Sequence, residues 1–393
     1  MVKKLTKILL ICHDVPSMTV GATLPLYHLV KQLGNKYDIH LVSFDSGKYD
    51  VSELEDYLDN VDTLPIPEYL NVKDQLKYTV KNMINTDNLS TRSFLNYYYH
   101  KDMKKLIKSF LDDVDVIITD MPMAFYVKSV EIPKIVYAFD AVSDYNYNMY
   151  RKASNLTSRV YWYLNYLKIH NYEKVYTNFD SCILVNRKDK EILERDIHTR
   201  LDVIPNGVDT EYFRNASDVF DNRIVFLGDM STPPNNDAVR YFMDEIYPHV
   251  NNIPFWIVGR NPSDYIKQLG SVENIHVTGS VLDVREYLTP GSIFVTPMIS
   301  GTGIKNKILE AMSMGLAVVS TSIGIDGIDA EDDKEYLLAD DPEIFAQHII
   351  KLSENREVSE IIGENARKFV YSKYSWETSM HKMDMIIRNI MIL

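Results

Sequence analysis

The chain has 393 residues, of which 46% are hydrophobic and 25% are charged. This length favours two domains, and the balance is that of a packed globular protein rather than a disordered or fibrous one. Lys and Arg number 42 against 55 Asp and Glu, a net charge of −13, which repels a polyphosphate backbone and so excludes nucleic acid as a partner.

The two cysteines, Cys12 and Cys182, are far apart and form no Cys-x-x-Cys pair, so neither a disulfide framework nor a zinc site is indicated. The apolar stretch 8–12 is too short for a signal peptide, and no stretch approaches the ~20 apolar residues of a spanning helix. The sequence therefore predicts a cytoplasmic protein without a cofactor. Any membrane contact is expected to be peripheral, at the inner face of the membrane.

Short runs rich in Ile and Val alternate with longer amphipathic runs, as in parallel sheets covered by helices on both faces. A first series predicts strands at 7–12, 37–44, 115–119, 134–138, 181–185 and 201–204. A second series predicts strands at 223–228, 255–259, 275–279, 292–297 and 317–321. Each series is typical of a Rossmann-like domain.

The junction between the two series is expected where Pro205 and Asn206-Gly207 supply turn chemistry. This divides the chain into an N-terminal domain, 1–207, a C-terminal domain, 208–375, and a final helix, 376–393. The final helix has an apolar face that must be buried, formed by Met380, Met383, Ile386, Ile387 and Ile390. We expect it to pack back on the N-terminal domain.

Two stretches of the first domain, 73–108 and 151–174, mix Lys or Arg with Tyr, Trp and Leu. This mixture is found in helices that lie at a membrane surface. It is also found in solvated helix faces above aromatic cores. Both interpretations stay open at the level of the sequence.

The strongest local pattern runs from Thr296 to Gly315, where a strand is followed by a glycine-containing loop and a helix. Gly301 and Gly303 would let the backbone approach a ligand, and the helix would offer free N–H groups and a positive dipole end to an anion. Lys305 and Lys307 stand at the start of that helix, where the dipole disfavours cations. A bound diphosphate would offset this local cost.

Glu310 lies seven residues beyond Gly303, about 10 Å along a helix with a rise of ~1.5 Å per residue. That is the separation of a diphosphate from its ribose, so the carboxylate is placed to accept both ribose hydroxyls. The alternative is a solvated helix residue that pairs with Lys307.

The whole run resembles the donor-binding signature of retaining glycosyltransferase family 4, whose members have the GT-B fold. Further segments follow in the family's order, namely Ile204-Pro-Asn-Gly-Val-Asp, Gly228, Pro234-Asn-Asn-Asp-Ala, Ile257-Val-Gly and Gly279-Ser-Val-Leu-Asp-Val-Arg. The resemblance implies two Rossmann-like domains facing across a cleft, with a nucleotide-sugar site in the second domain and an acceptor site in the first.

By this resemblance Lys305 contacts the leaving diphosphate and Glu310 holds the donor ribose. The remaining donor-binding candidates are Gly21, Gly228, Gly301, Thr302, Gly303, Ile304 and Asn306. Two positions depart from the family. The first glutamate of its Glu-x7-Glu motif falls at Thr302, and the arginine often found after the first strand of the second domain is replaced by Asp229-Met230.

In the first domain, Gly21 stands where such enzymes place a glycine near the donor phosphates, although a helix-start glycine would look the same. Asp140 occupies the place where many relatives carry a histidine near the sugar, so we name it with Lys305 as a catalytic candidate. It would bind a sugar hydroxyl or the acceptor, and the alternative is a helix N-cap. His13, at the carboxyl end of a strand, is either an acceptor or sugar contact or a structural residue.

Metal chemistry is disfavoured. Asp113-Val-Asp115 has the Asp-x-Asp form with which GT-A transferases hold a metal, but these acids precede their strand and are expected to initiate it. His-Glu-x-x-His and Gly-x-Ser-x-Gly are both absent from the sequence.

The sequence therefore predicts a metal-independent retaining glycosyltransferase of the hexosyltransferase type. It would move a sugar from a nucleotide-diphosphate sugar to a hydroxyl of a glycan or lipid-linked acceptor, in bacterial surface polysaccharide or glycoconjugate synthesis. The loss of the first motif glutamate and of the histidine motivates one alternative, a non-catalytic GT-B subunit that partners an active transferase. Another is a phosphorylase or nucleotide-sugar epimerase on the same fold.

Overall fold

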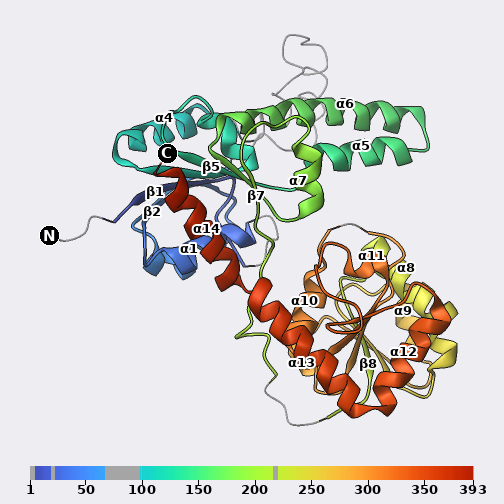
Figure 1. The fold of residues 1–393 in the computed structure, drawn as a ribbon. Helices are drawn as coiled ribbons and strands as arrows, with labels where there is room; N and C mark the ends of the chain where they lie inside the picture. The colour runs from blue at the N-terminus through green and yellow to red at the C-terminus, as the bar shows by residue number, and fades with distance from the viewer. Residues whose placement is uncertain are drawn as a thin grey trace. The chain divides into compact units, whose positions relative to one another are not determined.

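The computed structural model describes residues 5–18, 23–66, 98, 100–215, 220–301 and 303–392. The chain forms two compact units, each with a parallel sheet and packed helices (Figure 1). Unit 1 comprises Met1–Pro205 and Met380–Leu393, and unit 2 comprises Asn206–Ser379.

Within the described residues, unit 1 has a seven-stranded parallel sheet in the order β3-β2-β1-β4-β5-β6-β7. Its strands are β1 Lys7–Cys12, β2 Asp38–Asp45, β3 Asn60–Pro65, β4 Val116–Asp120, β5 Lys134–Phe139, β6 Ser181–Leu184 and β7 Leu201–Val203. β1 is central, and Ile8 pairs with Ile39 of β2 on one side and with Val116 of β4 on the other. Because β1 is covered on both faces, all of its residues after Lys7 are buried.

The helices of unit 1 are α1 Leu24–Leu33, α4 Lys101–Phe110, α5 Val142–Lys152, α6 Leu156–Glu173 and α7 Arg187–Leu193. Short helical turns cover Ser52–Tyr57, Leu111–Asp113, Met121–Tyr126 and Lys174–Asn178. Alternate residues of β1, Leu9 and Ile11, join one core with Ile107 of α4 and Tyr172 of α6. Figure 1 shows α4 and α6 on one side of this sheet and α1 on the other.

Unit 2 has, in the part of the chain that the structure describes, a six-stranded parallel sheet in the order β10-β9-β8-β11-β12-β13. Its strands are β8 Ile224–Leu227, β9 Phe255–Val258, β10 Ile275–Gly279, β11 Ile293–Thr296, β12 Ala317–Ser320 and β13 Leu337–Leu338. Its helices are α8 Pro233–Tyr241, α9 Asp264–Leu269, α10 Asn306–Ser313, α11 Ser322–Ile325, α12 Pro342–Glu354 and α13 Arg356–Lys373. Short helical turns cover Phe242–Ile246, Tyr247–His249 and Val284–Tyr287.

Alternate residues of β8 enter two different cores, one on each face of the unit 2 sheet. Ile224 and Phe226 pack with residues of α8, α9 and α12. Val225 and Leu227 pack with residues of α10 and α13. This double coverage explains why β8 is an uninterrupted apolar run in the sequence.

The last helix, α14 Trp376–Ile390, begins in unit 2 and belongs to unit 1 from Met380 onward. Its buried face is the one named from its spacing, Met380, Met383, Ile386, Ile387 and Ile390. In addition, Asp384 accepts a hydrogen bond from the hydroxyl of Tyr37 at 2.6 Å and forms an ion pair with Arg388 at 3.2 Å.

All eleven strands expected from the sequence are present in the structure, with end points that differ by one residue at most. Two strands were missed, β3 Asn60–Pro65 and β13 Leu337–Leu338. β3 is an edge strand in which no residue is buried, so it lacks the apolar run that marks the others. Across the described ranges, no helix is both long and apolar enough to span a membrane.

Candidate active site

The unit 2 sheet reverses its strand order between β8 and β11. β9 and β10 lie beyond β8 on one side, and β12 and β13 lie beyond β11 on the other. In open parallel sheets, the loops that leave two such strands diverge at their carboxyl ends and form a crevice that binds ligands. The loops here are 228–232 and 297–305, which hold most of the donor-binding residues expected from the sequence.

The loop after β11 has an open backbone at Gly303. Gly303 has a φ of 75° and Gly301 a φ of 122°, conformations that only glycine adopts at low cost. A methyl group added to Gly303 would meet no atom within 4 Å among the described residues, whereas one added to Gly301 would lie 3.8 Å from the Cβ of Pro234. Thr302, between them, lies outside the described residues.

Helix α10 begins directly after this loop. Lys305 is its N-cap residue and makes no side-chain capping bond, and Asn306 is the first helical residue. The first turn holds no acidic side chain, so its amide groups and the positive end of the dipole are suited to an anion. Ile304 instead packs on Gly327, where an added Cβ would lie 2.9 Å from the Cγ1 of Ile304.

Lys307 and Glu310 of α10 are charged residues that are partly buried. The Nζ of Lys307 donates a hydrogen bond to the Oδ1 of Asn235 at 2.8 Å and lies 4.4 Å from the centre of the Phe226 ring. Burial, and then the neighbouring charge of Lys305, lower the pKa of Lys307 to about 7, with Glu310 opposing this effect. Burial likewise raises the pKa of Glu310 to about 7, against the attraction of Lys307. Within the described chain no ion pair joins Lys307 to Glu310. The alternative interpretation, in which Glu310 is a solvated residue that pairs with Lys307, is therefore not supported.

The loop after β8 is closely packed at Gly228. An added Cβ there would lie 2.6 Å from the Nδ2 of Asn235, and one on Gly259 would lie 1.8 Å from the Gly228 carbonyl oxygen. Asn235 also donates a hydrogen bond to the carbonyl of Asp229 at 2.9 Å. Asn235 therefore links the β8 loop to Lys307 on α10, a connection that the sequence analysis missed.

A guanidinium group lies at this edge of the sheet, but it comes from an unexpected strand. Arg260 follows β9, and its Nε donates to the Oδ2 of Asp229 at 2.7 Å. Asp229 also accepts hydrogen bonds from the backbone and the hydroxyl of Ser231. These bonds, followed by the one from Arg260, hold the pKa of Asp229 well below its usual range. Asp229, at the position where the sequence resemblance implies an arginine, thus orients an arginine from the neighbouring strand.

Unit 1 has its own change of strand order, between β1 and β4. His13 follows β1, and Asp120 ends β4. The Nδ1 of His13 lies 2.5 Å from the Oδ2 of Asp120, which also accepts from the His13 backbone N–H at 2.8 Å. Asp120 is fully buried, while the His13 side chain is 16% exposed. His13 thus lies beside a carboxylate at a position where open sheets bind ligands.

The Asp120 charge sets the protonation of His13. Burial lowers the pKa of the ring, but the charge and hydrogen bond of Asp120 outweigh it, so the pKa of His13 lies above its usual value. Among the described residues, the Nε2 of His13 has no hydrogen-bond partner. Asp120 was not among the residues expected from the sequence, because its partner is 107 positions away.

Asp140 follows β5, directly after Phe139, whose φ of 67° is unusual for an aromatic residue. Burial, and then the charge of Asp189, raise the pKa of Asp140 to about 6. The N-cap residue of α5 is Ala141 and makes no side-chain capping bond, so the alternative that Asp140 caps this helix is wrong. Gly21 lies outside the described residues.

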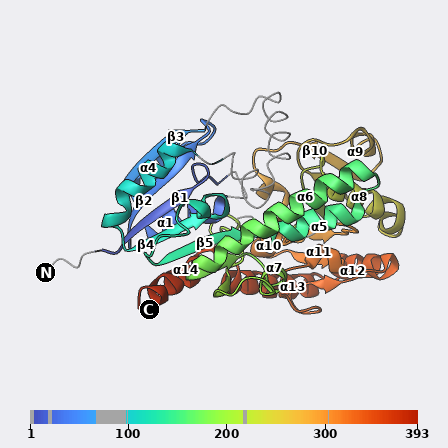
Figure 2. The same cartoon turned by 90° about the horizontal axis from the view of Figure 1, so that it is seen from above.

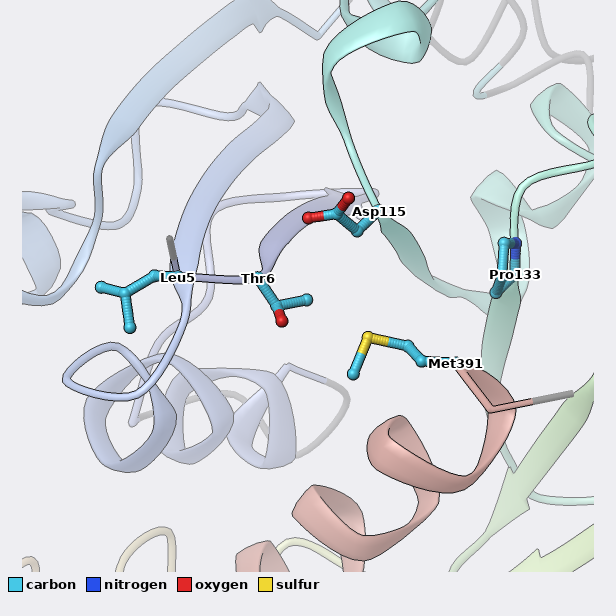
Figure 3. Close-up of a pocket in the computed structure, with 5 residues that line it drawn as sticks. All are labelled: Leu5, Thr6, Asp115, Pro133 and Met391. Atoms are coloured by element: carbon cyan, nitrogen blue, oxygen red, sulfur yellow. The ribbon is translucent and has the colours of Figure 1, made fainter. Parts of the chain in front are cut away.

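The Asp-x-Asp segment lies at the opposite edge of the unit 1 sheet. Asp115 accepts a hydrogen bond from the backbone N–H of Lys7 at 2.8 Å. β4 begins directly after it, at Val116, which confirms that the segment initiates a strand. A depression of about 430 Å³ lies beside it. Figure 3 shows the residues that line it, Leu5, Thr6, Asp115, Pro133 and Met391. Over the described ranges, no group of three or more His, Cys, Asp or Glu side chains is arranged to hold a metal ion.

The segment that contains the unit 2 site matches a known family. Residues 221–355 match the model described as Glycosyl transferases group 1. The chain therefore carries a group 1 glycosyltransferase domain. This domain includes Gly228, Asp229, Arg260 and the whole of the loop that leads into α10.

Two relatives are similar to part of the chain. An uncharacterized 44.6 kDa protein in the cps region of Klebsiella pneumoniae is 23% identical over 241 residues, which are 58% of this chain and 61% of that protein. An uncharacterized glycosyltransferase of Methanocaldococcus jannaschii is 27% identical over 215 residues, 51% of this chain and 57% of that one. The chain spans less than two thirds of the length of either relative.

Three solved structures are similar to nearly the whole chain. A sucrose-phosphate synthase from Thermosynechococcus elongatus has a TM-score of 0.66 and 14% identity, over 98% of this chain and 99% of that one. A glycosyltransferase from Rickettsia africae has a TM-score of 0.67 and 14% identity, over 98% of each chain. Anabaena HepE in complex with UDP and glucose has a TM-score of 0.64 and 13% identity, over 97% of this chain and 99% of that one. At these identities the likeness concerns the fold. The protein has the GT-B fold, with two Rossmann-like units as expected.

The candidate residues divide between the units. Lys305, Asn306 and Glu310 of the group 1 domain lie on or beside α10, at the unit 2 crevice. His13 and Asp140 lie at the carboxyl edge of the unit 1 sheet. Three further residues, Asp120, Asn235 and Arg260, were not recognised from the sequence. Each forms a hydrogen bond with a partner on another loop or helix, namely His13, Lys307 and Asp229.

Proposed function

We propose that the protein is a retaining, metal-independent glycosyltransferase of the hexosyltransferase type, which uses a nucleoside-diphosphate sugar. One observation carries the proposal. At the crevice of the group 1 domain, the open backbone of Gly303 leads into the amino end of α10, which also bears the partly buried Lys307 and Glu310. The similar fold of HepE, which was solved in complex with UDP and glucose, supports a donor of this class.

The diphosphate would lie against the amino end of α10. Its charge would be balanced by the helix dipole, by the Gly303 and Ile304 amides and by Lys305. Arg260, held by Asp229, would add a further cation at the same edge of the sheet. Gly301, Thr302 and Asn306 would complete this part of the donor site.

Glu310 would accept hydrogen bonds from the two ribose hydroxyls. Taking a carboxylate out of water is costly unless it is hydrogen-bonded, and partial burial raises the pKa of Glu310 to about 7. Two ribose hydroxyls would favour its charged form. Nucleoside binding is therefore expected to lower the pKa of Glu310.

Sugar transfer would follow a front-face course. The bond between the anomeric carbon and the diphosphate oxygen breaks, the acceptor oxygen bonds to the same face, and the acceptor proton passes to the departing oxygen. The protein's task is to stabilise the charge on that oxygen, an effect for which the loss of one donor costs ~3 kcal/mol. Lys305 would supply most of it.

Unit 1 would bind the acceptor. His13 would accept a hydrogen bond from a hydroxyl of the sugar or acceptor through Nε2, Asp140 would bind a second hydroxyl, and Gly21 would lie near the phosphates. A glycan or lipid-linked acceptor in bacterial surface polysaccharide or glycoconjugate synthesis suits a cytoplasmic enzyme at the inner face of the membrane. The relative in a cps region is in keeping with this setting.

Calorimetry with UDP, other nucleoside diphosphates and inorganic diphosphate tests the donor site. Lys305→Ala should weaken every diphosphate-containing ligand, and turnover should fall about a hundredfold. Glu310→Gln should weaken the nucleoside diphosphates but leave inorganic diphosphate unchanged. Lys351→Ala, at an exposed position of α12 in the same unit, is the control for charge loss.

Calorimetry and analysis of the reaction products separate the alternatives. A non-catalytic subunit would bind none of the nucleotides, whereas free phosphate or an epimerised donor among the products would identify a phosphorylase or an epimerase. Normal turnover of folded Lys305→Ala would remove Lys305 from the mechanism.

A further inference from the structure

Helices α5 and α6 of unit 1 form a hairpin that is attached to the unit at one end only. They lie side by side, joined by 153–155, and extend beyond the sheet in both views (Figures 1 and 2). Buried residues occur only near the attached end, at Ser143 and Asn146 of α5 and at Ile169, Tyr172 and Glu173 of α6. From 147 to 168, here named the distal hairpin, no side chain is buried.

Aromatic residues lie on several sides of the distal hairpin. Some of them join the two helices, since the ring of Tyr147 lies 5.2 Å from that of Tyr166, and that of Tyr150 lies 5.2 Å from that of Tyr163. Others face solvent, and the most exposed large side chains are Leu156 (78%), Tyr161 (51%) and Val160 (50%). A helix that is apolar around its circumference is normally buried, so this surface is expected to be covered by something.

The charge of the hairpin is opposite to that of the chain. From 145 to 172 the sequence contains no Asp or Glu, and its Lys and Arg residues are Arg151, Lys152, Arg159 and Lys168. The segment thus carries a charge of +4, and because the whole chain carries −13, the remainder carries −17. Arg151, Lys152 and Arg159 are exposed near the turn of the hairpin.

We infer that the distal hairpin binds the surface of an anionic lipid bilayer. Tyr and Trp are the side chains that settle at the boundary of headgroups and acyl chains, and Lys and Arg add attraction to anionic lipids. Because no described helix can span a bilayer, the hairpin would lie in the interface. The strongly acidic remainder of the chain would be repelled from the same surface, so the hairpin would be the part that makes contact.

A second copy of this chain is a less suitable occupant. In a symmetric contact the same patch meets itself, which would bring two sets of four positive charges together. An anionic lipid surface instead supplies both the opposite charge and the apolar layer that the aromatic residues require. This inference stands on the surface of the hairpin alone and does not depend on the proposed transferase reaction.

Flotation of the full-length protein with vesicles tests the inference. We expect binding to phosphatidylcholine vesicles that contain phosphatidylglycerol, weak binding to phosphatidylcholine alone, and release by high salt. The triple variant Arg151→Glu, Lys152→Glu and Arg159→Glu should lower the partition coefficient about a hundredfold or more, since each basic residue near such a surface contributes about fivefold. Arg187→Glu, Lys188→Glu and Arg195→Glu change the net charge equally at exposed positions elsewhere in unit 1 and should bind nearly as the wild type does.

Two further measurements address the apolar part of the contact. Val160→Asp should reduce binding strongly, whereas Val272→Asp, at a residue of similar exposure in unit 2 (50% and 46%), should not. Trp162 lies in the distal hairpin, so its fluorescence should shift to shorter wavelength on vesicle binding, and Trp162→Phe should abolish that shift.

The inference is wrong if the folded wild type does not bind anionic vesicles. It is also wrong if both triple variants lose vesicle binding to the same extent. Binding without any Trp162 response would place the contact elsewhere. A dimer that forms without lipid and is lost in Val160→Asp would identify a second copy of the chain as the occupant.

Discussion

At the scale of single residues, the pair His13 and Asp120 is expected to set the acid limb of the activity. The Nε2 of His13 can accept a hydrogen bond only while the imidazole ring is neutral, and Asp120 raises the pKa of that ring. Activity should therefore rise with pH through a value above the ordinary one of about 6.5. In Asp120→Asn the effect of burial remains without the opposing charge, so the limb should move to lower pH. The pH profile of kcat/KM in the wild type and the variant measures this shift.

A second histidine pair of unit 1 provides the matched control. The Nε2 of His40 lies 2.8 Å from the Oδ2 of Asp62, so Asp62→Asn also removes a carboxylate beside a histidine. It should leave the profile unchanged. His13→Ala should lower kcat/KM about tenfold, the value of one hydrogen bond. If the acid limb of kcat/KM in Asp120→Asn lies at the same pH as in the wild type, the pair has only a structural role.

These residues also show what the sequence can and cannot reveal about a site. Lys305 caps α10 and Glu310 lies within it, so the local sequence alone places these two candidates near each other. Asp120 and Arg260 act through residues on other loops, and only the strand order, β1 beside β4 and β8 beside β9, brings them to their partners. Sequence spacing carries no such information, so the replacement of an arginine by Asp229 gives no sign in the sequence that Arg260 lies beside it.

At the scale of elements, the loop between β11 and α10 depends on the left-handed backbone of Gly303. Gly303→Ala should cost about 1–2 kcal/mol of stability, because an L residue is strained in this conformation. The added methyl group meets no described atom, so the loop itself should survive. Its methyl group would, however, occupy the space proposed for the diphosphate, and nucleotide binding should weaken. Thermal unfolding and nucleotide calorimetry measure the two effects separately.

Gly279 offers a closely matched comparison for this loop. It has a φ of 68°, against 75° for Gly303, and an added Cβ would also meet no described atom within 4 Å. Gly279→Ala should therefore lose similar stability while nucleotide binding is retained. Equal weakening of binding in both variants would show that strain, rather than contact with the ligand, explains the effect.

The elements themselves were largely predictable because burial on both sheet faces demands uninterrupted apolar runs, as in β8 and β11. The exceptions follow the same physics. β3 is an edge strand with no buried residue, and β13 has two residues only. Neither provides a hydrophobic pattern long enough to recognise, and both are fixed by pairing with the neighbouring strand.

At the scale of the whole molecule, the chain leaves unit 1 after Pro205 and returns to it with Met380. The stability of the first unit therefore depends on residues that follow the second unit in the chain. Met383 is fully buried, and Met383→Ala should cost about 2–5 kcal/mol through the cavity that it leaves. Because residues 380–393 belong to unit 1, the loss should fall on unit 1. Nucleotide binding by unit 2 should be unchanged at temperatures at which the variant is folded.

Met385 lies on the same helix but is 51% exposed, so Met385→Ala tests helix propensity and side-chain loss without a cavity. It should change stability by no more than about 0.5 kcal/mol. Differential scanning calorimetry, with and without a nucleoside diphosphate, separates the two units, because the ligand raises the unfolding temperature of the unit that binds it. Destabilisation of the ligand-sensitive transition by Met383→Ala would mean that α14 stabilises unit 2 as strongly as unit 1. The two units would then unfold together rather than as separate bodies that share one helix.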